Sequence, residues 1–451
     1  MVMLASEHVN VKLKAAATST RGADAPLSLP KCSHDVTLGR PVGHGSCAVV
    51  FSVERVETSE AKPLSRTELV AKVGMSGEDS CESSLEAKIL SSLPRHINIV
   101  GFYGNFCTVE RNEDLEVLLG NFARRTLSRK RQARSVTKSA MARKEEMQRI
   151  ASEVSATMQA SELDVLQPLL HNFSLFEKCS LSLKDLLRFQ TLTESELACA
   201  MSDVFRGLAF VHKHGVLHRD LTDGNLLIAE GGLRVVLADF DLSVETQGSS
   251  QVPWTCGTPG FMAPEVLKNG RGCAKSDIFG AGVIAFSAAC GKHPFWREDI
   301  QDVQDAARAT LHDEPDFWGG HVLRRSSKCL GFVEQLLQKQ VDDRPTAKQA
   351  LCDPWLLSGA ASSNLCAAME RYNKVRSEED MEEEQEEIPR TRSIFRRAVH
   401  ALLSSTRTSE TKPSKDSVQS GRSVRSVRSA GSFWKLWRKR GDVKFSQISP
   451  A

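Results

Sequence analysis

Two short polar segments constrain the fold of this 451-residue chain more than any other feature. They are His218-Arg219-Asp220-Leu221-Thr222-Asp223-Gly224-Asn225 and, further on, Asp239-Phe240-Asp241. Strand signals dominate the sequence up to about residue 176, and helical patterns dominate from Ser180 to about Leu357. This order predicts an α+β protein in which a small β-rich part leads into a larger α-rich part.

The strand signals come in separate segments around one predicted helix. We expect a hairpin over Val36–Val56 and strands over Leu69–Val73, Ile99–Phe106 and Leu169–Phe176. Residues 81–93 have apolar residues at helical spacing, and Pro94 then stops the helix. A short hinge near Glu177 leads into the helical region.

Three regions lack the periodicity of a packed domain. Residues 1–34 are rich in small residues and are predicted to be a flexible leader. Residues 109–163 are basic in their middle, and we interpret them as a solvated insertion, with a nucleic-acid or acidic-lipid patch as the alternative. Residues 358–451 combine an acidic run, basic segments and a Ser/Arg-rich stretch, which predicts a low-complexity regulatory tail.

The composition limits the class of protein. With 41% hydrophobic residues the chain can bury a sizeable core, and a net charge of +3 is too small to predict a nucleic-acid or membrane partner. The 12 cysteines include no Cys-x-x-Cys pair, so we interpret them as reduced thiols of an intracellular protein. The N-terminus has no secretory pattern, and the longest apolar stretch, Ile278–Cys290, is too short to span a bilayer.

A glycine-rich turn and a lysine within an apolar run indicate phosphate binding. The turn is Gly43-His44-Gly45-Ser46-Cys47-Ala48-Val49-Val50, whose glycines let backbone N–H groups approach a phosphate closely. Taken alone, this pattern fits a plain glycine turn better. Lys72 lies within Leu69–Val73, where a lysine would be costly without an anionic partner.

Further motifs follow in a fixed order along the chain. They are Thr255-Cys256-Gly257-Thr258-Pro259-Gly260-Phe261-Met262-Ala263-Pro264-Glu265, Ser276-Asp277-Ile278-Phe279-Gly280 and Asp343-Arg344-Pro345-Thr346. The ordered set resembles the eukaryotic-type protein kinase family, Ser/Thr branch, with an activation segment most like that of the calcium/calmodulin-dependent group. The resemblance implies a two-lobed protein kinase fold over residues 35–357, with a small β-rich N-lobe that carries the 109–163 insertion, a larger α-helical C-lobe, and flexible extensions.

The resemblance also implies a role for each matching position. Asp220 would orient the substrate hydroxyl and accept its proton, and Lys72 would hold the phosphates of ATP and pair with Glu86. Asn225 and Asp239 would bind Mg²⁺, which prefers oxygen ligands. The residues implied to form the ATP site are Val42, Gly43, His44, Gly45, Ser46, Val50, Val70, Lys72, Glu86, Phe176, Glu177, Cys179 and Leu227.

Other motif residues are implied to be structural. His218 would be a packing residue of the core, and Asp277 would brace the catalytic loop from a buried helix. Arg344 would pair with Glu265. Phe176 would close the adenine pocket behind the hinge.

The chain departs from the family pattern at four positions. Ala48 replaces the third glycine of the turn, and Val70 stands where alanine is usual. Thr222 replaces a lysine that helps to neutralise the γ-phosphate, and this loss is expected to slow transfer roughly ten- to a thousandfold. Asp241 replaces a glycine and is expected to make the Asp239-Phe240-Asp241 triplet less mobile.

These motifs favour a Ser/Thr protein kinase that transfers the γ-phosphoryl group of ATP, with Mg²⁺, to Ser or Thr hydroxyls of proteins. The alternative, which the four departures favour, is a pseudokinase scaffold that acts through protein–protein contacts. A tyrosine kinase would also explain Thr222, but the Gly257-Thr258-Pro259 segment argues against it.

The tail has two basic segments with apolar residues, Ile394–Leu403 and Ser432–Arg440. Trp434 and Trp437 among cations suit a calmodulin groove or an anionic membrane surface, and a disordered tail with incidental aromatics is the alternative. No specific nucleic-acid partner is expected. We expect a cytoplasmic protein, with membrane association or nuclear entry through the basic tail as alternatives.

Overall fold

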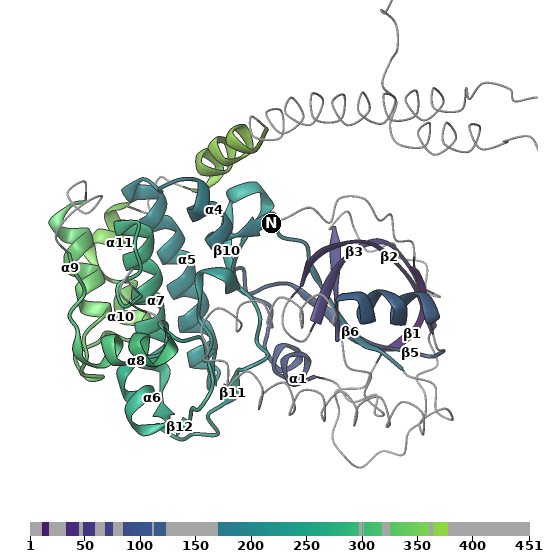
Figure 1. Cartoon of the computed structure of the whole chain (residues 1–451), viewed down its shortest axis with the longest axis horizontal. Helices are drawn as coiled ribbons and strands as arrows, with labels where there is room; N and C mark the ends of the chain where they lie inside the picture. Colours follow the sequence, from purple (N-terminus) through teal and green to yellow (C-terminus); the bar gives the residue numbers. More distant parts are fainter. Residues whose placement is uncertain are drawn as a thin grey trace, which may run out of the picture. The chain divides into compact units, whose positions relative to one another are not determined.

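The computed structural model describes residues 11–17, 33–44, 48–58, 68–74, 84–110, 112–122, 170–296, 300, 302–317, 325–359 and 364–377 (Figure 1). The chain divides into two compact units, Met1–Glu379 and Asp380–Ala451, and every described residue lies in the first. Both predicted tail segments, Ile394–Leu403 and Ser432–Arg440, therefore lie outside the described residues, as do residues 123–163 of the predicted insertion.

Six antiparallel strands form a closed barrel in the order β1-β2-β3-β4-β6-β5 (Figure 1). Their bounds are β1 Val11–Ala17, β2 Ser33–His44, β3 Ala48–Thr58, β4 Leu69–Gly74, β5 Phe102–Thr108 and β6 Asn172–Glu177. Along β4, burial alternates with the period of two that a strand imposes. Leu69, Ala71 and Val73 face the buried side, which turns Val70 and Lys72 to the opposite face.

Strand β1 comes from the segment that was predicted to be a flexible leader, and that prediction is wrong for residues 11–17. β1 pairs with β2 along most of its length and with β5 near its end, where Ala16 lies opposite Cys107. Leu13 and Ala15 are buried in the barrel core. The alternation of apolar residues with Lys12 and Lys14 is the strand signal that the sequence reading passed over.

The start of the predicted insertion also belongs to the barrel. Residues 113–122 form a helix, and its residues Leu115, Leu119 and Phe122 are buried in the same hydrophobic cluster as the strands. Their spacing of four and three residues places them on one helical face. The predicted boundary at residue 109 is therefore wrong, because the packed structure continues to residue 122.

Helix α1, Leu85–Ser92, confirms the helix predicted before Pro94. Its N-cap is Ser84, whose hydroxyl accepts a hydrogen bond from the Ala87 N–H at 3.2 Å. The buried face of α1 carries Glu86 beside apolar residues. A carboxylate is thereby placed in a buried position, where it needs a partner.

The rest of the described chain is mainly helical, with short strands between the helices (Figure 1). The helices are α4 Leu183–Phe189, α5 Glu194–Lys213, α6 Pro264–Asn269, α7 Ala274–Cys290, α8 Val303–His312, α9 Ser327–Leu336, α10 Ala347–Ala350 and α11 Pro354–Gly359. The short strands and 3₁₀ turns are β7 Leu181–Ser182, β8 Val216–Leu217, η1 Asp223–Asn225, β9 Leu226–Ala229, η2 Glu230–Gly232, β10 Arg234–Leu237, β11 Val244–Glu245, β12 Val252–Pro253 and β13 Arg271–Gly272.

A second hydrophobic cluster fills this helical part, with α5 and α7 at its centre. Almost every residue of α7 is buried, so the prediction of a buried helix over Ile278–Cys290 is confirmed. Among the described helices, none combines the length and the apolar character that crossing a membrane requires.

The structure tests one predicted long-range contact and the predicted state of the cysteines. Arg344 is almost fully buried, and its guanidinium donates to both carboxylate oxygens of Glu265 at 2.9 and 2.7 Å, which confirms the predicted pair. Eight described cysteines are free, as expected for reduced thiols, but Cys107 takes part in a disulfide bond, so the prediction is wrong for that residue.

The packed structure also continues past the predicted start of the tail at residue 358. Residues 366–377 form a helix, and Leu365, Ala368 and Met369 are buried against the helical part. The Leu365 N–H donates to the Gly232 carbonyl at 2.9 Å, and Arg371 forms an ion pair with Glu196 at 2.8 Å. The tail boundary at residue 358 is therefore wrong.

Truncation of Leu365 tests whether this segment is part of the domain. Leu365→Ala removes a buried side chain and should lower the free energy of unfolding by roughly 2–3 kcal/mol. The matched control is Leu357→Ala, because Leu357 is 61% exposed and should cost little. The measurement is the midpoint of urea unfolding. Equal midpoints for the two variants would show that the segment contributes nothing to stability.

Candidate active site

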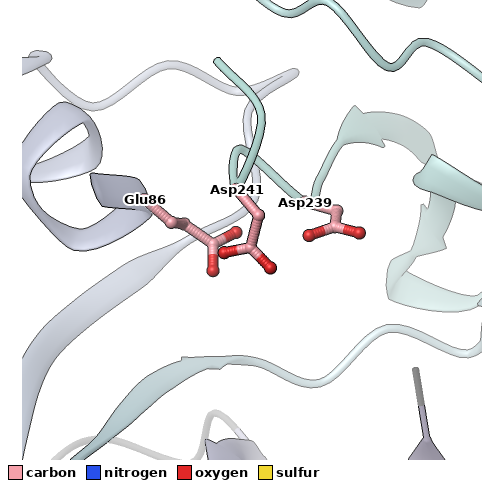
Figure 2. A group of neighbouring side chains, drawn as sticks. All are labelled: Glu86, Asp239 and Asp241. Carbon is pink, nitrogen blue, oxygen red and sulfur yellow. The ribbon is translucent and has the colours of Figure 1, made fainter. Parts of the chain in front are cut away.

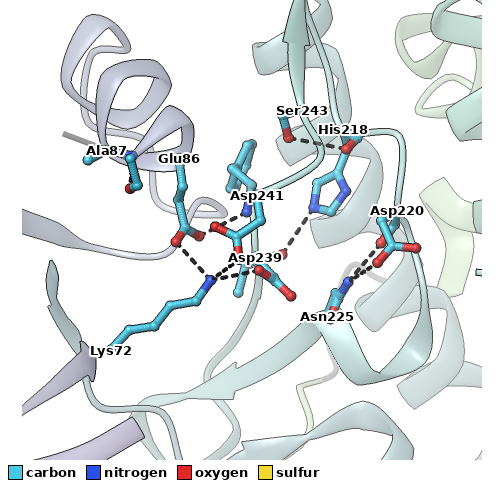
Figure 3. A network of polar contacts seen from close by, with 12 residues as sticks. Lys72, Glu86, Ala87, His218, Asp220, Asn225, Asp239, Asp241 and Ser243 are labelled. Atoms are coloured by element: carbon cyan, nitrogen blue, oxygen red, sulfur yellow. Dashed lines mark hydrogen bonds and ion pairs between the residues drawn. The ribbon is translucent and has the colours of Figure 1, made fainter. Parts of the chain in front are cut away.

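The ammonium group of Lys72 lies at the centre of a cluster of three carboxylates (Figure 3). Its Nζ donates to Glu86 Oε2 at 2.9 Å, to Asp239 Oδ1 at 2.8 Å and to Asp241 Oδ2 at 2.8 Å. The predicted pairing of Lys72 with Glu86 is confirmed. The sequence analysis did not place Asp241 in this cluster.

Three separate elements bring these groups together. Lys72 projects from β4, Glu86 from α1, and the two aspartates from the turn that follows β10. The Phe240 N–H donates to Glu86 Oε1 at 2.9 Å, so Glu86 binds the turn with one oxygen and Lys72 with the other. Asp239 has a positive φ of 64°, an uncommon backbone conformation for a residue other than glycine.

The charges in the cluster do not cancel, and this shows in the pKa values. Burial raises the pKa of Glu86 to about 7, although the charge of Lys72 acts in the opposite direction. Burial alone would lower the pKa of Lys72, but attraction to Glu86 and the two aspartates raises it. Burial opposes ionisation of Asp239, yet the Lys72 ammonium lowers the pKa of that carboxyl.

The half-buried carboxylate of Asp220 is held from two sides. Its Oδ1 accepts hydrogen bonds from the N–H of Thr258 at 2.9 Å and from the Thr258 hydroxyl at 2.7 Å. The Asn225 amide donates to the Asp220 carbonyl at 2.8 Å and makes a longer contact of 3.3 Å with Oδ2 (Figure 3). The Asn225 carbonyl accepts from the Ala238 N–H at 3.0 Å, which ties this loop to the residue before Asp239.

A buried aspartate on α7 braces the loop, as the resemblance implied. Asp277 accepts from the His218 N–H at 3.0 Å and from the Arg219 N–H at 2.9 Å. Burial opposes its ionisation, but hydrogen bonding to His212 and the neighbouring charge lower the pKa of Asp277. His218 is fully buried against the Phe240 ring, so its interpretation as a packing residue is confirmed.

Arg219 points away from the carboxylate cluster. Its guanidinium donates to Cys256 Sγ at 2.9 Å and lies 5.7 Å from the centre of the Trp254 ring. The backbone of Arg219 has a positive φ of 69°. The side chain of Arg219 therefore contacts the activation segment.

The backbone of the hinge leaves one amide open for a ligand. The N–H groups of Glu177, Lys178 and Ser180 donate to Gly101, Glu68 and Ile228 carbonyls, respectively. The Cys179 N–H has no such partner among the described residues, so it is the hinge donor that an adenine ring nitrogen could accept from. The Glu177 carboxylate is used in an ion pair with Arg234 at 2.5 Å.

The remaining predicted ATP-site residues that the structure describes lie on β2, β3, β4, β6 and β9. Gly43 and His44 pair through their backbones with Val50 and Val49, so the turn between them is a hairpin. Gly45 and Ser46 lie outside the described residues. Val42 is partly exposed, whereas Val70 and Leu227 pack at the margin of the helical core and Phe176 is buried within it.

The donor set fits a divalent cation that prefers oxygen ligands. Carboxylate oxygens of Glu86, Asp239 and Asp241 lie within 4.8 Å of one another (Figure 2). The predicted ligands were Asn225 and Asp239. Asn225 directs its amide N–H to Asp220, and its side-chain oxygen remains the atom suited to a cation. Asp241 is a third oxygen donor, which the sequence analysis considered only as a replacement for a glycine.

The Thr258–Asp220 contact was also missed. The sequence analysis used the Gly257-Thr258-Pro259 segment to argue against a tyrosine kinase and predicted no bond to Asp220. The two residues are 38 positions apart, and no periodicity links them. Such a contact depends on how the whole activation segment folds back over the loop.

Comparison with known proteins supports the resemblance. Residues 169–356 match the protein kinase domain family. A probable myosin light chain kinase of Dictyostelium discoideum is 34% identical over 175 residues, covering 37% of this chain and 55% of that protein. The calcium/calmodulin-dependent protein kinase cmkB of Emericella nidulans is 36% identical over 170 residues, with coverages of 36% and 41%. Calcium-dependent protein kinase 9 of Oryza sativa subsp. japonica is 38% identical over 177 residues, with coverages of 38% and 30%.

Residues 169–356 thus resemble a protein kinase domain, and the predicted resemblance to the calcium/calmodulin-dependent group of Ser/Thr kinases is confirmed. The aligned stretch spans about half or less of the length of these relatives.

The raised pKa of Glu86 predicts a specific pH dependence of stability. Between pH 4.5 and about 7 the folded protein holds a proton on Glu86 that the unfolded chain has lost. The stability of the wild type relative to Glu86→Gln should therefore fall as pH rises through this window, by up to about 3 kcal/mol. Urea unfolding of both proteins from pH 4.5 to 8 measures the difference. A difference that is constant or rises with pH would contradict the assignment.

Proposed function

We propose that this protein is an active, two-lobed Ser/Thr protein kinase that transfers the γ-phosphoryl group of ATP to Ser or Thr hydroxyls of proteins. The observation that carries the proposal is the meeting of Lys72, Glu86 and Asp239 at 2.8–2.9 Å, next to a loop that holds Asp220 and Asn225. Phosphoryl transfer needs positioning and charge neutralisation more than covalent chemistry, and these groups supply both.

Asp220 is suited to act on a substrate hydroxyl. Its Oδ1 already accepts a hydroxyl hydrogen bond from Thr258 at 2.7 Å, which is the reach required of a general base. Within the described part of the chain, its Oδ2 has only the 3.3 Å contact with Asn225. A substrate Ser or Thr hydroxyl can therefore donate to Oδ2 without displacing the hydrogen bonds that orient the carboxylate.

Mg²⁺ would be held by Asp239 and Asn225, with Asp241 as a further oxygen donor. The ion would neutralise negative charge on the phosphates when bound. Two protein groups would contact the nucleotide directly. The Cys179 N–H would orient the adenine, and Lys72 would exchange part of its contact with the aspartates for a phosphate oxygen.

The alternative is a pseudokinase scaffold, and one observation favours it. The family pattern has a glycine at the position of Asp241. The Asp241 carboxylate accepts a hydrogen bond from the Lys72 ammonium at 2.8 Å and so competes with a phosphate for that charge. Against it stands the retention of Lys72, Glu86, Asp220, Asn225 and Asp239, each of which is held by hydrogen bonds.

We also propose that the basic tail takes a protein or membrane partner and that the protein is cytoplasmic. The names of the relatives include calcium/calmodulin-dependent kinases, which supports calmodulin as the partner of Ser432–Arg440. An anionic membrane surface is the alternative partner.

Loss of Lys72 or Asp220 should abolish transfer. Lys72→Met removes the phosphate-binding cation and Asp220→Asn removes the base, so each should reduce kcat by at least about a hundredfold. The measurement is radiolabelled phosphate transfer from ATP to a generic protein substrate, with thermal unfolding as the check on folding. Wild-type activity in both variants would refute the assignment. Inactive wild type, with no ATP-dependent rise in Tm, would favour the scaffold.

The missing cation at position 222 can be restored. Thr222→Lys should raise kcat more than it changes the KM for ATP, because the added charge acts most strongly as the transition state develops. Thr222→Met is the matched control, since it adds length without charge. An unchanged or lower kcat in the lysine variant would show that the site has no need of this charge.

A further inference from the structure

Helix α4 presents an exposed lysine beside the catalytic loop. The Lys184 Cδ atom lies 3.9 Å from the position that a Cβ on Gly224 would occupy, and the Thr222 Oγ1 atom lies 3.5 Å from the same position. Lys184 makes no hydrogen bond or ion pair with any other residue that the structure describes. Its ammonium group is therefore an available charge at the edge of the site.

The neighbouring acids do not neutralise this charge. Burial raises the pKa of Asp223, and Lys184 acts on that carboxyl only through its charge, without direct contact. Asp185 accepts a hydrogen bond from the Ser182 hydroxyl at 2.8 Å as part of the cap of α4. Each nearby carboxylate is thus partly buried or engaged, whereas the lysine is exposed.

A second cation extends the same face of the helix. Arg188 is also exposed and follows Lys184 by four residues, which places both side chains on one face of α4. Like charges at this spacing destabilise a helix slightly, so local stability does not explain the arrangement. Arg376 lies against the end of α4, with its guanidinium 5.8 Å from the centre of the Phe189 ring. Lys184 and Arg188 thus place two cations on one face of α4.

Among the described residues, the catalytic loop forms no ion pair with Lys184, and Asp223 acts on that lysine only through its charge. Gly224 has no side chain and Thr222 is uncharged and buried, so Lys184 covers the loop at that point. The other base of the loop, Arg219, is directed to Cys256. The side chain of Lys184 therefore lies beside Thr222 and Gly224, in the loop that also carries Asp220.

We propose that Lys184, with Arg188 on the same face, selects protein substrates that carry an acidic group, a carboxylate or a phosphate, near the acceptor hydroxyl. The inference rests on the proposed phosphoryl transfer and names its substrate class. Lys184 is in this account a specificity-determining residue, because it binds the substrate chain and takes no part in the transfer.

The test uses the full chain and a set of matched peptides. Each peptide has one acceptor serine in an uncharged sequence, with Glu, phosphoserine, Gln or Lys placed at one flanking position at a time. The ratio of KM for the Lys peptide to KM for the Glu peptide is measured for the wild type, Lys184→Glu and Lys184→Gln. Lys348→Glu is the control, since Lys348 is an exposed lysine on α10 outside the site.

The wild type should favour the acidic peptides at one or more positions by roughly two- to fivefold in KM, the effect of one exposed charge pair. Lys184→Gln should abolish the preference, Lys184→Glu should reverse it, and Lys348→Glu should keep it. Preference for Glu or for phosphoserine would identify the acidic group taken. Transfer without charge preference, or a preference that survives in Lys184→Glu, would overturn this inference alone. No transfer by the wild type to any peptide would instead overturn the proposed function.

Discussion

The site depends on the ion pairs that Lys72 forms with Glu86, Asp239 and Asp241. One positive charge faces three carboxylates, so the cluster has excess negative charge that burial makes costly. The excess is relieved in part by protonation, as the raised pKa of Glu86 shows. A bound divalent cation would relieve it further, because it would bring two positive charges to the same oxygens. The geometry that is unfavourable in the free protein would therefore favour a bound divalent cation.

The same cluster couples three parts of the chain. Glu86 on α1 accepts a hydrogen bond from Lys72, which lies on the barrel strand β4. Glu86 also accepts a hydrogen bond from the Phe240 N–H in the turn after β10. The network continues from Ala238, the residue before Asp239, through Asn225 to Asp220 and Thr258, so the activation segment is linked to the carboxylates by hydrogen bonds and by the chain between Ala238 and Asp239. A shift of α1 that broke the Glu86 contacts would therefore alter both the charge around Lys72 and the support of the turn that carries Asp239, Phe240 and Asp241.

Local patterns predicted the parts of the fold that local chemistry decides. The helix before Pro94, the buried helix over Ile278–Cys290 and the Lys72–Glu86 pair could be read from periodicity or from motif residues. The errors fell where tertiary packing overrides a weak local signal. Leu365 and Phe122 stand in charged, low-complexity surroundings, and only their burial against distant elements shows that they are core residues. The extra carboxylate of Asp241 was visible in the sequence, but its contact with Lys72 depends on the turn's conformation.

The closure of the barrel by β1 has a consequence for the integrity of the β-rich part. Without residues 11–17, the outer edges of β2 and β5 would each expose a row of unpaired N–H and C=O groups. The ladder between β1 and β5 has only three residue pairs, Ala15–Thr108, Ala16–Cys107 and Ala17–Phe106, so it is a short seam. Opening that seam would turn a sealed barrel into a sheet with two free edges, each a template for pairing with another chain. By pairing with β2 and β5, β1 thus protects their edges from pairing with another chain.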